Sequence, residues 1–189
     1  MQLRSGVAVH CFIAGLILLV AGCASTPTPN NTANTEHLLS LIGQRLHYMD
    51  DVARNKWNSG APIEDLPRET EIIENLGKQA PAYGLDAAIA RDFFRAQIEA
   101  SKIIQRNRFV EWRAEKRLPF KNIPDLSDTI RPALDALTPE LMKALAAALP
   151  ELAKTGARTI KSRAGIIVAA DAAARDEAVS PLLRLATAP

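Results

Sequence analysis

The sequence is poor in the residues that most metal and redox sites need. It contains two cysteines, Cys11 and Cys23, and three histidines among 189 residues, and the histidines show no metal-ligand spacing. The net charge of +2 produces too weak an electrostatic field to attract the protein to DNA or to anionic membranes. The sequence also has no RNA-binding motif and no internal repeat. We therefore expect neither a metal centre nor a nucleic-acid partner.

Long runs of β-branched residues are also missing, and alanine and leucine dominate the chain. Apolar residues make up 48% of the sequence, which is ample for a hydrophobic core. This composition favours helices over strands. We predict an all-α helical bundle of one domain, followed by a helical extension.

The first 22 residues have the features of an export signal. They carry one basic residue, Arg4, and an apolar stretch from Phe12 to Val20 that is too short for a stable membrane span. The segment Val20-Ala21-Gly22-Cys23 resembles a bacterial lipobox, in which the cysteine thiol is acylated and becomes the new amino terminus. The alternative is an ordinary signal peptide that is cut near the same place.

We favour lipidation at Cys23, because a cysteine directly after Ala-Gly is otherwise unusual. The next residue is alanine rather than aspartate, which favours the outer membrane. We expect an exported, periplasmic protein that meets the membrane only through a lipid anchor at Cys23. Cys11 would leave with the signal, so no disulfide is expected.

The remaining chain is expected to form three parts. Residues 23–35 are polar and contain proline, which is typical of a disordered tether. Residues 36–120 are predicted to form the helical domain that carries the site. Residues 121–189 are predicted to form a helical extension that contributes Arg131 to it.

Capping signals predict where the helices begin and end. Thr35 should cap a first helix that runs to about Asn58, where Ser59-Gly60-Ala61-Pro62 interrupts it. Asp65 should cap a second helix and Asp86 a third, which runs to about residue 117.

The extension carries further helix signals. Ser127 or Asp128 should cap a helix that carries Arg131, and Thr138-Pro139-Glu140 should open another. From residue 149 onward the alanine-rich pattern indicates a helix, but it assigns no functional role to this segment.

Two cations lie in the middle of an apolar helix face. Arg45 and Lys56 are eleven residues apart, so at 100° per residue they point within about 20° of each other. The same arc holds Leu38, Leu41, Ile42, Met49 and Val52. A buried charge must be paired by the protein or by a ligand. We favour an anionic ligand, and the alternative is an internal salt-bridge network in which Asp65 and Arg68 pair.

The third predicted helix carries polar residues on its inner face. Gln97, Ser101 and Gln105 are spaced four apart in the centre of the apolar arc. The charged residues predicted on the opposite face are Arg91, Arg95, Glu99, Lys102 and Arg106. One buried glutamine would indicate a core hydrogen bond, but three polar residues in a row favour a polar pocket.

The inward-facing polar residues contain four cations and two carboxylates. They are Arg45, Lys56, Asp65, Arg68, Glu69, Ser101, Gln105 and, as a further candidate, Arg131. No nucleophile stands beside a base, and no histidine or metal set is among them. Because arginine binds carboxylates as a planar fork, the set suits a small ligand with two carboxylates and a hydroxyl.

Several of these residues match one family at once. Arg45-Leu46, Lys56-Trp57, PIED at 62–65, Arg68-Glu69 and QIEASKIIQ at 97–105 resemble the all-helical, AroQ-type chorismate mutases. The export signal and DLSDTIRPALDAL at 125–137 are similar to the secreted gamma subclass. The resemblance covers about residues 36–136. It implies the rearrangement of chorismate to prephenate without a cofactor, in aromatic amino acid biosynthesis, by a homodimer.

The resemblance also implies roles for these residues. Arg45 and Arg131 would hold the substrate carboxylates, with help from Ser101. Arg131 would replace, within one chain, an arginine that cytosolic relatives take from a second subunit. Lys56 and Gln105 would donate hydrogen bonds to the ether oxygen as its bond to carbon breaks.

The remaining roles concern the second predicted helix. Arg68, held by Asp65, would support the positive field, while Glu69 and the Asp65 backbone would meet the ring hydroxyl. Some relatives have glutamate where this chain has Gln105, and that difference bears on the pH dependence of activity. Two alternatives are a lipoprotein that binds a chorismate-like dicarboxylate without turnover, and a structural lipoprotein with buried ion pairs.

Overall fold

The computed structural model describes residues 32–187. The predicted export signal, Cys23 and most of the tether of residues 23–35 lie outside this range. The described part is helical and contains no strand, so the predicted all-α class is confirmed. No helix within residues 32–187 is long and apolar enough to cross a membrane.

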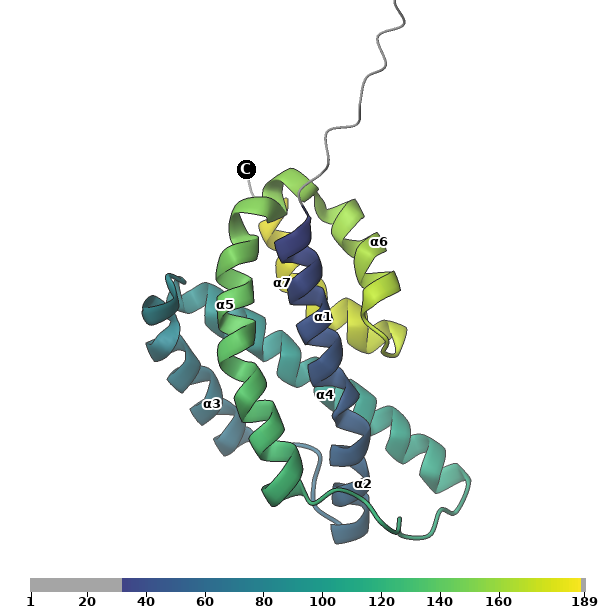
Figure 1. Ribbon diagram of the computed structural model, residues 1–189. Helices are drawn as coiled ribbons and strands as arrows, with labels where there is room; N and C mark the ends of the chain where they lie inside the picture. Colours follow the sequence, from purple (N-terminus) through teal and green to yellow (C-terminus); the bar gives the residue numbers. More distant parts are fainter. Residues whose placement is uncertain (1–31, 188–189) are drawn as a thin grey trace, which may run out of the picture.

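Seven α-helices follow one another along the described chain, with one 3₁₀ and one π-helical segment between them. They are α1 (Ala33–His47), α2 (Met49–Ser59), α3 (Leu66–Gln79), η1 (Ala80–Tyr83), α4 (Ala87–Ala114), η2 (Leu126–Ile130), α5 (Arg131–Thr155), α6 (Ala157–Ile167) and α7 (Ala172–Leu185). The long α5 lies beside α1, and α4 crosses behind them (Figure 1).

The predicted first helix is divided into two. Helical bonding breaks at Tyr48 and resumes where Val52 N donates to Tyr48 O at 3.0 Å. The predicted cap at Thr35 is also wrong, because α1 begins at Ala33 and Thr35 is buried inside its first turn. There the Thr35 backbone N–H donates to Oε2 of Glu151 in α5, at 3.1 Å. A carboxylate from a distant helix therefore does the work expected of a local cap.

The other early boundaries follow their capping signals. Gly60 ends α2 in the left-handed conformation, with φ of 69°. Asp65 caps α3 by accepting from Arg68 N, and Asp86 caps α4 by accepting from the amides of residues 88 and 89. These predictions are confirmed.

The start of α5 differs from the prediction. Asp125, rather than Ser127 or Asp128, is the capping residue, and it caps η2, which leads directly into α5. Its Oδ1 accepts from the backbone N–H groups of Ser127 and Asp128 at 2.7 Å. The predicted new helix at Thr138-Pro139-Glu140 is not separate, because α5 runs through Pro139 to Thr155. Packing along α1 outweighs the hydrogen bond that the proline removes.

One hydrophobic core unites the two predicted parts of the chain. Leu38 of α1 and Phe93 of α4 belong to the same buried cluster as Leu145 of α5 and Leu182 of α7. Helix α4 packs mainly against α7 and α3, while α1 packs mainly against α5. The segment η2, which directly precedes α5, contacts α2. The first turn of α5 is thereby fixed close to α2.

A separate aromatic cluster fixes α2 against α4. The Trp57 ring meets Phe109 edge-on, with centroids 5.3 Å apart, and Trp112 meets Phe120 at 4.6 Å. Asn58 and Phe120 also exchange two hydrogen bonds, from Asn58 Nδ2 to Phe120 O at 2.9 Å and from Phe120 N to Asn58 Oδ1 at 2.8 Å. The helix end that carries Lys56 is thus held rigidly.

Candidate active site

One pocket of about 540 Å³ opens between α1, α2, α3, α4 and the first turns of α5. All eight residues predicted from the sequence line it: Arg45, Lys56, Asp65, Arg68, Glu69, Ser101, Gln105 and Arg131. They come from five helices and the loop before α3, and packing alone brings them together. Their contacts within the protein decide which of them are free to bind a ligand.

Arg45 is held in place without a carboxylate partner. Its Nη1 donates to Ser101 Oγ at 2.6 Å and to the Gln97 carbonyl at 3.1 Å. Its Nε and Nη2 donate to no acceptor in residues 32–187, so the fork that binds carboxylates is free. Burial lowers the pKa of Arg45 to about 10, which leaves the side chain charged at neutral pH.

Lys56 is the second enclosed cation. Its Nζ donates to the Ile63 carbonyl at 2.7 Å, which leaves two ammonium donors for a ligand. Burial lowers the pKa of Lys56, and nearby Glu69 and Asp65 oppose that shift in part. Within residues 32–187 neither Arg45 nor Lys56 lies in an ion pair, so a salt-bridge network does not account for them.

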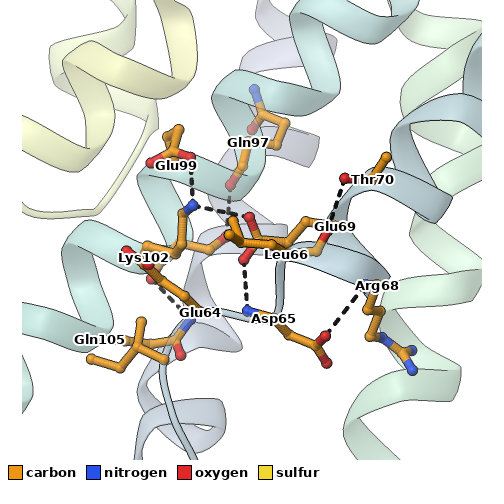
Figure 2. Close-up of polar contacts among 12 residues, drawn as sticks. Glu64, Asp65, Leu66, Arg68, Glu69, Thr70, Gln97, Glu99, Lys102 and Gln105 are labelled. Carbon is orange, nitrogen blue, oxygen red and sulfur yellow. Dashed lines mark hydrogen bonds and ion pairs between the residues drawn. The ribbon is translucent and has the colours of Figure 1, made fainter.

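The amino-terminal turn of α3 supplies the acidic wall (Figure 2). Asp65 Oδ1 accepts from the Arg68 backbone N–H at 3.3 Å, and Glu69 Oε1 accepts from the Asp65 N–H at 3.1 Å. The two bonds are reciprocal as in a capping box, although Glu69 lies one position beyond the N3 residue of that motif. The predicted hold of Asp65 on the Arg68 side chain is therefore wrong, because the Asp65 carboxylate binds the Arg68 backbone instead.

The three polar residues of α4 do not act alike. Gln97 does not line the pocket, because its Nε2 donates to the Ala178 carbonyl of α7 at 2.8 Å. For this residue the core hydrogen bond is the correct interpretation. Gln105 donates one Nε2 hydrogen to the Ser101 carbonyl at 3.1 Å and keeps the other for a ligand. Its buried Oε1 has no partner within the described residues.

Arg131, the first residue of α5, also lines the pocket. Its Nη1 makes one long contact of 3.4 Å to Ser127 Oγ, so most of its donors remain available. Asp135, one turn later, also lines the pocket. All four predicted cations, Arg45, Lys56, Arg68 and Arg131, thus line the pocket within one chain.

Sequence reasoning misses Lys102. The helical period places it on the outer face of its helix, yet its side chain is only 7% exposed and lines the pocket. Its Nζ lies 2.9 Å from Glu69 Oε2 and 2.5 Å from Glu99 Oε1 (Figure 2). Burial lowers the pKa of Lys102, but the bonds from Glu99 and Glu69 outweigh it and raise the pKa overall. The available signal is its position next to Ser101, with Glu99 three residues earlier.

The charges that line the pocket leave a net positive site. Five cations (Arg45, Lys56, Arg68, Lys102 and Arg131) face three carboxylates (Asp65, Glu69 and Asp135). The excess of two positive charges matches a doubly anionic ligand. A neighbouring hollow of about 590 Å³ shares Lys56 and Ile63 with it but adds only Arg113 as a cation.

The fold and the pocket together define an all-helical protein with a binding site for a small anion. The hydrogen-bond donors of that site are held in place by the protein itself. Residues 34–106 match the family model of chorismate mutase type II. The secreted chorismate mutase of Mycolicibacterium smegmatis is 31% identical over 137 residues, which cover 70% of this chain and 75% of that protein. The chain belongs to the chorismate mutase family.

Solved structures agree with this assignment. The chorismate mutase of Burkholderia thailandensis is 34% identical, with a TM-score of 0.66 over 80% of this chain and 98% of that one. The Burkholderia phymatum enzyme is 29% identical, with a TM-score of 0.68 over 79% of this chain and 98% of that one. The match extends well beyond residue 106, so the extension belongs to the shared fold.

Proposed function

We propose that this pocket is the active site at which the chain, as a chorismate mutase, rearranges chorismate to prephenate. The observation that carries the proposal is the pair of enclosed cations, Arg45 and Lys56, that line one pocket without a carboxylate partner. Such charges are stable only when a ligand or solvent compensates them. A substrate with two carboxylates supplies that compensation.

Binding begins with two arginines that line the pocket from different helices, Arg45 of α1 and Arg131 of α5. Arg45 presents its free Nε and Nη2 donors, and its Nη1 is fixed by Ser101. Arg131 presents its donors from the start of α5. Together they clamp the two carboxylates and select the folded conformer in which the reacting carbons meet.

The chemical step needs stabilisation of charge rather than proton transfer. As the ether bond breaks, negative charge grows on the oxygen, and Lys56 and Gln105 each have a free N–H for it. One preorganised donor to such an oxygen contributes roughly 2.7–4 kcal/mol. Enzymes of modest power lower a barrier by roughly 8 kcal/mol, so two donors plus conformer selection suffice in magnitude.

The amino-terminal turn of α3 binds the ring hydroxyl of the substrate. Glu69 is oriented by the Asp65 N–H and accepts from that hydroxyl. Arg68 forms no ion pair through its guanidinium within the described residues and adds to the positive field. These roles for Asp65, Arg68 and Glu69 follow from the resemblance and from their place in the pocket.

We also propose how the protein is exported and assembled. Relatives from Mycolicibacterium smegmatis and Yersinia pestis are named secreted chorismate mutases, which supports export of this chain. Cleavage before Cys23, a lipid anchor on its thiol, a periplasmic position at the outer membrane and a homodimer are finer proposals. Mass spectrometry of the mature amino terminus tests the first two, and light scattering tests the last.

An absorbance assay of chorismate disappearance tests the function directly. The chain is purified as residues 23–189 with Cys23→Ser, and prephenate is confirmed by its acid conversion to phenylpyruvate. The proposal fails if no prephenate forms. Calorimetric binding of a dicarboxylate transition-state mimic without turnover would then select a binding protein instead.

A further inference from the structure

We propose that Lys102 is a positioning residue for the substrate hydroxyl and acts by fixing the carboxylate of Glu69. The inference rests on the proposed function, because Glu69 must be the group that meets the hydroxyl. It goes beyond that function, since Lys102 belongs neither to the cations that reach the substrate carboxylates nor to the donors at the ether oxygen. The helical period alone places the residue on the outer face of its helix.

Burial makes Lys102 unlike an ordinary surface lysine. Its side chain is 7% exposed, whereas that of Lys143, which makes a similar i,i+3 ion pair with Glu140, is 62% exposed. An ammonium so enclosed is stable only with compensating carboxylates, and Lys102 has two. Glu99, on its own helix, is 40% exposed and serves as the outer partner. Glu69, on α3, is 17% exposed and faces the pocket.

Glu69 is consequently held from two directions (Figure 2). Its Oε1 accepts from the Asp65 N–H at 3.1 Å and its Oε2 from Lys102 Nζ at 2.9 Å. Each oxygen keeps a second lone pair, so the carboxylate can still accept a hydroxyl hydrogen. Its rotation is blocked, however, and the direction of that lone pair is set before the substrate arrives.

The ion pair also joins α3 to α4. Without Lys102, Glu69 would be attracted by Lys56, the other enclosed cation whose charge it influences. The Glu69 carboxylate would then neutralise the donor that the ether oxygen requires. Lys102 thus keeps one acceptor and one donor apart in a small pocket.

The test is a double-mutant cycle of Lys102→Met and Glu69→Gln, measured as steady-state kinetics on the chain of residues 23–189. We expect Lys102→Met to lower kcat/KM by about tenfold, equivalent to about 1.4 kcal/mol. Loss of the hydroxyl contact, which is made alike in ground and transition states, should raise KM, whereas capture of Lys56 by the released Glu69 should lower kcat. In the Glu69→Gln background the same change should cost less than about threefold.

Lys143→Met is the matched control, because it removes an exposed lysine from an i,i+3 ion pair. It should leave kcat/KM unchanged. Circular dichroism and urea unfolding show whether each variant folds. If Lys102→Met does not fold, Lys102→Gln replaces it in the same cycle.

Two results would overturn the inference while the proposed function stands. One is wild-type kcat/KM in the Lys102 variant. The other is an equal loss in both backgrounds, which would mean that Lys102 acts on the substrate or the fold independently of Glu69. Absence of turnover in the unmutated chain would instead refute the proposed function itself.

Discussion

Replacement of Gln105 by glutamate isolates the donor at the ether oxygen. Gln105 is 4% exposed, and its Nε2 donates to the Ser101 carbonyl while a second hydrogen faces the pocket. The substitution keeps length and shape but exchanges an amide, which donates at any pH, for a carboxyl, which donates only when protonated. In the ionised form of the Gln105→Glu variant, the new carboxylate would also face the Ser101 carbonyl across the same 3.1 Å.

The expected cost follows from the state of that carboxyl. Loss of one preorganised donor costs roughly 2.7–4 kcal/mol, or about 10²–10³ in kcat. Burial raises the pKa of a carboxyl, and nearby cations such as Lys56 lower it. Whatever the balance, the protonated form disappears as pH rises, so activity of the variant should fall about tenfold per pH unit above that pKa.

The assay is kcat/KM for chorismate from pH 5 to pH 8, with the unmutated chain as control. The unmutated chain should change little over this range, because Gln105 does not titrate. At higher pH its activity should decline as Lys56 loses its proton, and burial brings that decline below the ordinary pKa of 10.5. A variant that stays as active as the control at pH values where its carboxyl is ionised, followed above pH 8 if the profile is flat below it, would refute a donor role for residue 105.

Three further substitutions test other parts of the structure. Lys56→Met should lower kcat by about 10²–10³ with helicity intact, whereas exposed Lys78→Met should not; comparable rates in both would contradict the donor role. Arg131→Ala should lower kcat/KM by about 10–100-fold through loss of a charged hydrogen bond to the substrate. In steady-state kinetics, unchanged kcat and KM would contradict the binding role of Arg131. Glu151→Ala should destabilise the fold by about 1–3 kcal/mol in urea, because the Thr35 N–H loses its acceptor. Wild-type unfolding would show that this bond contributes nothing.

The helical period is enough to bring two central cations of the pocket together. It places Arg45 and Lys56 on one face although the helix breaks at Tyr48, because the break is one residue long and leaves both side chains in the same pocket. The caps Asp65 and Asp86 can be found because a cap is a local signal that survives tertiary packing.

The errors arise where distant contacts decide. The acceptor for Gln97 lies on α7, 81 residues later, and no local pattern reveals it. The charge of Lys102 favours solvent, yet carboxylates on two helices stabilise it inside. The cap on α1 comes from Glu151, 116 residues away, so the sequence around Thr35 indicates a local cap that does not form. Pro139 stays within α5 because packing, not propensity, sets that helix.

The position of Arg131 has a consequence for how the protein behaves when it is scarce. Every predicted side chain of the pocket, from α1 to the start of α5, belongs to a single polypeptide. Rate should therefore rise in simple proportion to the amount of protein, down to concentrations at which two copies seldom meet. An exported catalyst spread thinly outside the cytoplasm would thus keep a complete pocket in every chain.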